Sequence, residues 1–568
     1  MIKRQRTIAI ILAVCVVVMI PLYIFVIEPL TKALLESANQ NSDREIMYVQ
    51  TERTNIQSIE VKNDHGTYKF VYIKELDKFV IDGHELAGYD ATLFSQLVVD
   101  CGYTLSKATV ETENAEKLSE YGLDDASDPA YYILTNKEGT QYKVLIGDKI
   151  ISGGGYYARM DGENKVYILD TTLETTVLSP IEAFITPTIV FPTGLTTYFN
   201  IKDFAIFKGA YVPEGEDFGA DDKEESESEK APADSGSQSA SDSTPATQDE
   251  GGEQNKEEGK ENTASKVDPI VRFHYLGQQE LGAFGSNATF SMDYPGDGIY
   301  TPSGYLDSVL QMFIAYQGSE TVKLSPSTED LEKFGLLAES EYSIYLINYS
   351  TGKDENGKQV DIPVTNRVYF SKVQKDETTG EKFRYAHSLY YDETLMIFNN
   401  IVVKIPDYNC AYLEYDLNTW IASQLFSTVI GTVSTMQIQT PTDDITFTLT
   451  GEGTALTATE ANGHKPDITN FKKFYQTILS MEKGGYVALS DEEVAELVSK
   501  PENLTLTLTV KLRNGNQLVY KFYSYGVQTY YTVNGDGMFY LPTTQVSKVI
   551  ADAIRVTKDE IVYSDNPF

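Results

Sequence analysis

Five histidines are the residues of this chain best suited to acid–base or metal chemistry, and their spacing decides which chemistry is open to them. His65, His84, His274, His387 and His464 form neither an H-x-H pair nor an H-E-x-x-H motif, so the zinc site of a helical metalloprotease is missing. His84 and His464 each follow an Asp-Gly or Asn-Gly dipeptide and stand ten residues before a phenylalanine. A shared ligand-contact role is one hypothesis for this pair. The alternative is a pair of turn residues, because such dipeptides favour tight turns.

Four tyrosines form the second candidate site. Tyr156 and Tyr157 lie in "GYYARMDGENKVYIL", and Tyr530 and Tyr531 lie in the similar stretch "YYTVNGDGMFYL". These rings could form an aromatic face that contacts a glycan or a peptide, or they could be cross-strand pairs that stabilise a sheet. The glycines of "GGGYY" lead into a strand and lack the lysine and hydroxyl residue of a phosphate loop.

Other chemistry is also missing from the sequence. "MDGEN" and "NGDG" lack the ligand spacing of a twelve-residue calcium loop, and no G-x-S-x-G motif is present. Cys15, Cys101 and Cys410 form no C-x-x-C pair, so we expect Cys101 and Cys410 to be reduced and buried. We therefore predict no catalytic residues, no metal, no cofactor and no enzymatic activity.

The elements that would position these residues are mostly strands. "SIEVKN", "TYKFVYI" and "TLTLTVKL" alternate apolar and polar residues, as half-buried strands do. Three stretches at about residues 90–101, 303–316 and 468–481 instead carry an apolar stripe with helical spacing. "TLETTVLSPIEAF" predicts one further helix, which would close the first group of strands.

A repeated phrase shows how these elements are grouped. "EKLSEYGL" at residues 116–123 returns as "EDLEKFGL" at residues 329–336. Asp90 to Gly122 and Ser303 to Gly335 both span 32 residues, so each phrase stands at one distance from a predicted helix. We interpret the phrase as a short helix that its glycine terminates as a left-handed cap. The third counterpart, "ALSDEEVAEL", lacks the glycine but has capping-box spacing at Ser490 and Glu493.

These repeats predict an α+β protein built from three modules after an N-terminal transmembrane helix. The expected boundaries are 51–190, 196–430 and 431–560. Each module should be a mainly antiparallel sheet with helices on one face.

An acidic insertion interrupts the second module at residues 214–265. It holds 17 acidic residues and 4 lysines, with few large apolar residues, so it should be disordered. The flanking strands, "YFNIKDFAIFKG" and "PIVRFHYLG", would then form a hairpin. The whole chain carries a formal net charge of −37, which argues against nucleic acid as a partner.

The N-terminus predicts the location of the protein. Residues 7–27 contain no charge and are long enough to cross the hydrocarbon of a bilayer. Lys3, Arg4 and Arg6 precede them, so residues 1–6 should be cytoplasmic and the bulk extracytoplasmic. Residues 28–50 would form a stalk. The apolar run is longer than that of a cleaved signal peptide, and a valine precedes Cys15 where a lipoprotein needs a small residue.

The chain resembles a bacterial family through this span and three motifs. The motifs are L-x-x-[YF]-G-L, "VLIGD" and "GYYARMDGENKVYIL", and together they resemble membrane-anchored proteins of domain of unknown function 4340, most strongly over about residues 55–190. That resemblance implies no catalytic residues. It implies an accessory role beside a gliding-motility-like ATP-driven exporter, because the family's genes often neighbour such transporter genes.

The sequence thus leaves two functions open. The first is a membrane-anchored extracytoplasmic interaction or scaffold protein, held in lipid by residues 7–27 and partnered with a transporter permease or another membrane protein. The second is a protein that binds cell-envelope glycan or peptide.

Overall fold

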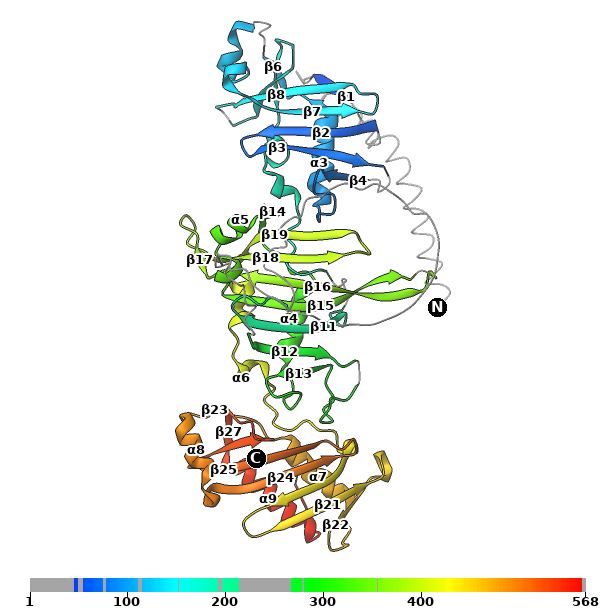
Figure 1. Ribbon diagram of the computed structural model, residues 1–568, viewed down its shortest axis with the longest axis vertical. Helices are drawn as coiled ribbons and strands as arrows, with labels where there is room; N and C mark the ends of the chain where they lie inside the picture. Colours follow the sequence, from blue (N-terminus) through cyan, green and yellow to red (C-terminus); the bar gives the residue numbers. More distant parts are fainter. Residues whose placement is uncertain are drawn as a thin grey trace, which may run out of the picture. The chain divides into compact units, whose positions relative to one another are not determined.

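Three large sheets dominate the structure (Figure 1). The computed structural model describes residues 45–49, 55–74, 78–110, 115–151, 153–192, 197–213, 267–277, 280–354 and 356–563. The chain forms two compact units: the first ends at Thr186 and also takes Ile397–Asn399, and the second holds the other residues from Pro187 onward. The first sheet belongs to the first unit, and the other two sheets belong to the second apart from Ile397–Asn399 at the start of β19.

Three predictions concern residues outside the described ranges: the tail 1–6, the transmembrane span 7–27 and the acidic insertion 214–265. Within the described ranges, none of the helices combines the length and the apolar character that a membrane crossing requires. The predicted stalk 28–50 is described only from residue 45, and there it contains strand β1 (Ile46–Val49).

The first sheet has the strand order β4-β3-β2-β7-β8-β9-β10-β6. Its adjacent strands are antiparallel, as predicted from the alternating pattern. Its strands in chain order are β2 (Ile56–Asn63), β3 (Gly66–Ile73), β4 (Lys78–Ile81), β6 (Ala108–Val110), β7 (Ala130–Asn136), β8 (Gln141–Lys149), β9 (Tyr156–Met160) and β10 (Val166–Leu169).

The second sheet has the order β13-β12-β11-β15-β16-β18-β19-β14, and β17 (Gln374–Lys375) pairs with β18. Its β11 and β12 are antiparallel neighbours, so the predicted hairpin on either side of the acidic insertion is confirmed. Its main strands are β11 (Ile201–Lys208), β12 (Pro269–Tyr275), β13 (Phe290–Tyr294), β14 (Glu320–Leu324), β15 (Tyr342–Lys353), β16 (Gln359–Phe370), β18 (Lys382–Asp392) and β19 (Ile397–Pro406).

The third sheet has the order β22-β21-β20-β24-β25-β26-β27-β23. In all three sheets the first three strands stand in reverse order at one end, the fifth to eighth follow, and the fourth closes the far edge. We call each sheet with its helices a module. The strands of the third are β20 (Val433–Gln439), β21 (Asp444–Thr450), β22 (Thr457–Glu460), β23 (Gly485–Tyr486), β24 (Leu504–Leu512), β25 (Gln517–Tyr525), β26 (Gln528–Val533) and β27 (Phe539–Pro542).

A core helix follows the third strand of every module. These helices are α3 (Ala91–Gly102), α4 (Gly304–Phe313) and α7 (Ile468–Leu479), and a side chain of Asp90, Ser303 or Asp467 caps each N-terminus. Aromatic rings hold them to the sheet: Phe94 of α3 lies 5.2 Å from Phe70, between ring centroids, and Phe471 of α7 lies 5.0 Å from Phe447.

The repeated phrase forms the second short helix of each module. It is the 3-10 helix η3 (Ala115–Tyr121) in the first, α5 (Thr328–Lys333) in the second and α8 (Asp491–Ser499) in the third. Gly122 and Gly335 have φ values of 67° and 68°, and the N–H of the leucine after each glycine donates a hydrogen bond to the carbonyl of Leu118 or Leu331. The predicted left-handed glycine cap is therefore confirmed, as is the capping box at Ser490 and Glu493.

The prediction that all helices share one face of their sheet is wrong. Phe70 pairs across strands with Ile59, and Ile59 pairs with Leu134, so α3 covers the face that these residues share. Leu118 of η3 packs instead with Leu145, which points to the opposite face. The short helix packs on the same face in the other modules, where Leu331 lies against Tyr369 and Leu497 against Tyr523. Strands such as "VLI" in β8 are apolar on both faces and need cover on both.

The predicted closing helix of the first module is two 3-10 helices, η5 (Thr171–Thr175) and η6 (Ile181–Phe184), because Pro180 interrupts the segment. The second module closes with α6 (Leu417–Trp420), and the third with α9 (Thr543–Thr557). Phe184 and Trp420 occupy equivalent positions in their modules. The carbonyl of each accepts a hydrogen bond from the N–H of a core-helix capping residue, Asp90 or Ser303. These closing segments complete the cover of the core-helix face.

Candidate binding groove

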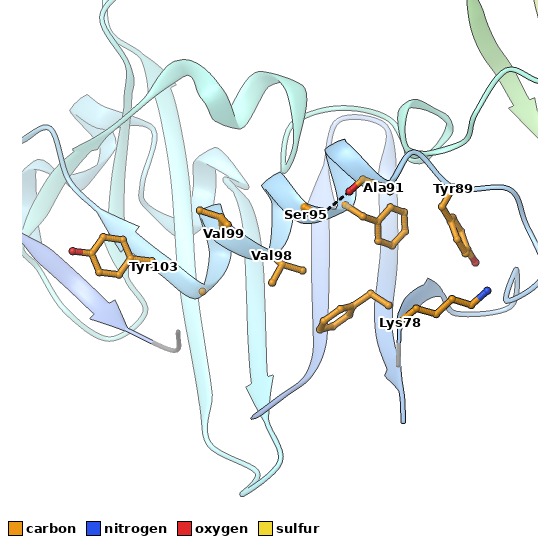
Figure 2. A pocket seen from close by; sticks show the side chains of 10 residues that line it. Lys78, Tyr89, Ala91, Ser95, Val98, Val99 and Tyr103 are labelled. Carbon is orange, nitrogen blue, oxygen red and sulfur yellow. Dashed lines mark hydrogen bonds between the residues drawn. The ribbon is translucent and has the colours of Figure 1, made fainter. Parts of the chain in front are cut away.

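A groove of about 460 Å³ runs along one flank of α3 in the first module (Figure 2). Lys78 and Phe79 of β4, the terminal strand of the first sheet, form one wall. Val98 and Val99 of the helix form the other, and Tyr103 stands just beyond the C-terminus of the helix. The lining is mostly apolar, which is typical of a surface that binds an apolar group.

The sequence of α3 explains why this flank is hollow. Phe94, Leu97 and Cys101 face the sheet and are buried. The neighbouring stripe carries small residues at Ala91, Ser95 and Gly102, which line the groove without filling it, and the Ser95 hydroxyl is held by the Ala91 carbonyl at 2.7 Å. Val99 remains 56% exposed, which is unusual for a valine on a core helix.

One end of the groove is polar. The Lys78 amine lies 5.9 Å from the ring centroid of Tyr89, and Figure 2 places both side chains at the same end of the helix. The Tyr89 hydroxyl accepts a hydrogen bond from the Ile81 N–H and donates one to the His84 carbonyl, and burial raises the pKa of this tyrosine. The groove therefore joins an apolar channel to a single positive charge.

His84, a predicted ligand-contact residue, lies next to this polar end. It follows Gly83, whose φ of 80° makes the turn after β4. Its carbonyl binds Tyr89, and burial lowers the pKa of its imidazole. The turn interpretation accounts for its position, and its backbone helps to fix one wall of the groove.

His464, the other predicted histidine, stands in a different setting. Its Nδ1 lies 2.5 Å from Glu460 Oε1 and its Nε2 lies 3.0 Å from Asp559 Oδ2. The hydrogen bond with Glu460 is the main reason that the pKa of His464 is raised. The pair with Asp559 connects the turn after β22 to the residues beyond α9, so the geometry describes a structural clamp. His84 belongs to the first unit and His464 to the second, and each is accounted for by contacts within its own module.

The four predicted tyrosines do not form one exposed face. Tyr530 and Tyr531 are both buried, on opposite faces of the third sheet. Tyr156 is held by Glu174, which its hydroxyl contacts at 2.9 Å, and Tyr157 packs on Tyr121 with ring centroids 4.8 Å apart. Burial raises the pKa of Tyr156. Cross-strand and side-chain packing account for these positions.

The remaining predicted chemistry is structural in the described residues. Cys101 and Cys410 are free, buried thiols, as expected, and burial raises the pKa of each. Within the described ranges, no three histidine, cysteine or acidic side chains come close enough together to hold a metal ion. His387 is buried against Tyr369, and burial lowers its pKa to about 4.

Sequence reasoning missed the groove because it treated the apolar residues of 90–101, Val98 among them, as one stripe that faces the core. Val98 is half-buried and lines the groove, and Val99 beside it is exposed. The signal was present in the small residues Ala91, Ser95 and Gly102. They share one flank of the helix and mark a surface that the helix itself does not fill.

Residues 103–272 match the family model described as Domain of unknown function (DUF4340). This match confirms the family resemblance, and it runs from the end of α3 into β12 of the second module. No curated protein and no solved structure gives a significant match to the chain.

Proposed function

We propose that this chain is a membrane-anchored extracytoplasmic interaction protein that docks a membrane partner through the groove beside α3. The groove carries the proposal because it is an open apolar surface of a size that accepts side chains of another molecule. It lies in the module that follows the predicted span 7–27 most closely in sequence.

The predicted topology limits where that partner can be. Glu45, the first described residue, follows the predicted span by 18 residues, so an extended connection would be at most about 65 Å long. A groove tethered at that range would meet the extracytoplasmic parts of neighbouring membrane proteins. The proposed partner is the permease of an ATP-driven exporter, as the family resemblance implies, and the chain would serve it as an accessory subunit.

Site-directed crosslinking in native membranes tests this proposal. A photoreactive side chain at Val99 should capture a membrane protein. The same group at Val527, a residue 86% exposed on the third module, serves as the matched control. Purification of the full-length chain should recover the same partner. Recovery of no membrane protein from Val99, or equal recovery from Val527, would count against docking at this groove.

The glycan-binding alternative depends on exposed tyrosines, and the burial of Tyr530 and Tyr531 weakens it. Retention of the extracytoplasmic part on purified cell wall, lost when Tyr156 and Tyr157 are changed to alanine, would restore that alternative.

A further inference from the structure

The third module contains the same helix flank as the groove, and there the flank is filled. An offset of 377 residues relates the helix caps Asp90 and Asp467, and it also relates Phe94 to Phe471, which contact the matching rings Phe70 and Phe447. The ten-residue spacing after His84 and His464 had instead paired Phe94 with Phe474, and the positions of the helix caps correct that pairing. The two flanks can therefore be compared residue by residue.

Each module receives an entry segment that pairs with the residues after its core helix. In the first module, Tyr48 of β1 pairs with Thr104 of β5 (Tyr103–Leu105). In the third, the Leu425 N–H donates to the Met481 carbonyl at 2.8 Å, and both residues stand at the same offset of 377. Val49, the residue after Tyr48, thus corresponds to Phe426.

Phe426 fills the flank of α7. Its side chain is 1% exposed, and its ring centroid lies 5.7 Å from that of Tyr475 and 5.8 Å from that of Tyr520. The Tyr475 hydroxyl donates to the Thr428 carbonyl at 2.7 Å, so the extended segment after Phe426 is fixed as well. Tyr475 corresponds to Val98 of the groove.

Among the described residues of the first module, no aromatic side chain takes that place. Val49 is 44% exposed, compared with 1% for Phe426, and Val98 is much smaller than Tyr475. Residues 50–54, "QTERT", follow Val49 in the sequence and bring no large apolar side chain. In the third module, an aromatic residue on an extended segment occupies this flank of the core helix. The groove of the first module should therefore accept a group of the same kind.

We propose that the groove beside α3 binds an extended segment of a partner protein, with an aromatic or large aliphatic side chain in the place that Phe426 takes against α7. Lys78 adds a positive charge at one end, so the segment carries a carboxylate there. Extended segments commonly dock beside the terminal strand of a sheet, and β4 is that strand here. This inference rests on the proposed docking function and specifies the chemistry of the partner.

A peptide with the sequence of residues 423–428, Ser-Gln-Leu-Phe-Ser-Thr, is the probe, with a free C-terminal carboxylate. Its binding to the full-length chain is measured by titration calorimetry or by fluorescence anisotropy of a labelled form. Replacing the peptide phenylalanine by alanine should lower the affinity at least tenfold, because burial of the ring contributes about 1.5–3 kcal/mol. Amidation of the carboxylate should lower the affinity further by a few-fold.

Two variants of the chain test the place of binding. Val49→Phe introduces the residue that fills the third module, and Val99→Glu places a charge in the groove at an exposed position. Both should lower the affinity for the peptide at least tenfold while the melting temperature stays within about 2 °C of the wild type or rises. Val527→Phe, the matched control, should bind as the wild type does.

Three results would overturn the inference. One is a peptide affinity that neither Val49→Phe nor Val99→Glu changes. The second is binding of dodecanoate, blocked by Val49→Phe, with no peptide binding, since that would assign the groove to an acyl chain. The third is crosslinking of a membrane partner that persists in Val49→Phe, and in that case the docking function stands while this account of the groove fails.

Discussion

Replacing Gly147 by alanine tests whether the repeated phrase is held on its sheet by direct backbone contact. A Cβ atom on Gly147 would lie 2.1 Å from the carbonyl oxygen of Tyr121 and 2.9 Å from Leu123 Cγ. A backbone oxygen cannot rotate out of the way, so residues 121–123 would have to move outward by about 1 Å to restore an ordinary contact.

The structure allows the free energy of this displacement to be worked out. Leu123 is completely buried, and its carbonyl accepts a hydrogen bond from Arg159 Nε at 3.1 Å. Overpacking of a closed site costs about 1–3 kcal/mol, and weakening a hydrogen bond to a charged group adds about 1 kcal/mol. We therefore expect the free energy of unfolding to fall by about 2–4 kcal/mol. The melting temperature of the first unit should fall by roughly 5–15 °C.

Calorimetric melting of the full-length chain measures this change, with hydrogen exchange of η3 and β8 to assign it to the first module. Gly88→Ala is the matched control, because a Cβ there meets no atom within 4 Å and the backbone is not left-handed. Its melting temperature should match that of the wild type.

The second module supplies an internal comparison. Ser371 stands two residues beyond Tyr369, as Gly147 stands two beyond Leu145, and its Cβ lies 3.9 Å from the position of a Cβ on Gly335. The second module therefore accommodates a Cβ atom at the position that corresponds to Gly147. If Gly147→Ala melts like Gly88→Ala, the first module accommodates a Cβ as the second does, and the close-contact reasoning is refuted.

Three further perturbations have defined outcomes. Trp420 is the only tryptophan of the sequence and is buried beside Phe273. Trp420→Ala should lower the free energy of unfolding of the second module by about 3–5 kcal/mol in denaturant titrations. Trp420→Phe should lower it less, because the first module has a phenylalanine, Phe184, at the equivalent position. The pKa of His464 is raised, so its pair with Glu460 stabilises the fold fully below the unfolded pKa near 6.5, and this contribution is lost as the pH rises through the folded pKa. His464→Asn should remove this loss from melting curves recorded between pH 6 and pH 8. An unchanged pH profile would contradict the pairing. His387 has the opposite effect on the pH dependence of stability. Its pKa of about 4 means that the free energy of unfolding falls by about 3 kcal/mol as the pH falls from about 6.5 to 4. His387→Gln should remove this loss at acidic pH.

The repeat could be predicted from the sequence because its signals are local. The phrase ends in a glycine that must adopt a positive φ, and Gly122 and Gly335 do so in the structure. The hairpin around the acidic insertion followed from the alternating patterns of β11 and β12, which the structure pairs. Such features depend on a few neighbouring residues and on backbone sterics.

Other features depend on contacts between distant segments and could not be predicted. Which face of the sheet the phrase covers is decided by the pairing of Leu118 with Leu145, and alternation alone does not assign a helix to a face. The sequence left the tyrosine pairs open between an exposed aromatic face and cross-strand packing, because nothing local shows that Tyr530 and Tyr531 are covered. The groove could not be predicted because the exposure of Val49 gains its meaning only from the comparison with the buried Phe426, which lies 377 residues away.

The entry segments determine where the chain can be truncated without exposing the core of a module. The third module was predicted to begin at residue 431, yet Leu425 and Phe426 belong to it by hydrogen bonding and packing. A truncated chain that starts at residue 431 would expose Tyr475, Tyr520 and Met481, and we expect it to aggregate. A chain that starts at residue 421 keeps Leu425 and Phe426, so these side chains stay covered. The repeating structural unit therefore begins at its entry segment, before the first strand of its sheet.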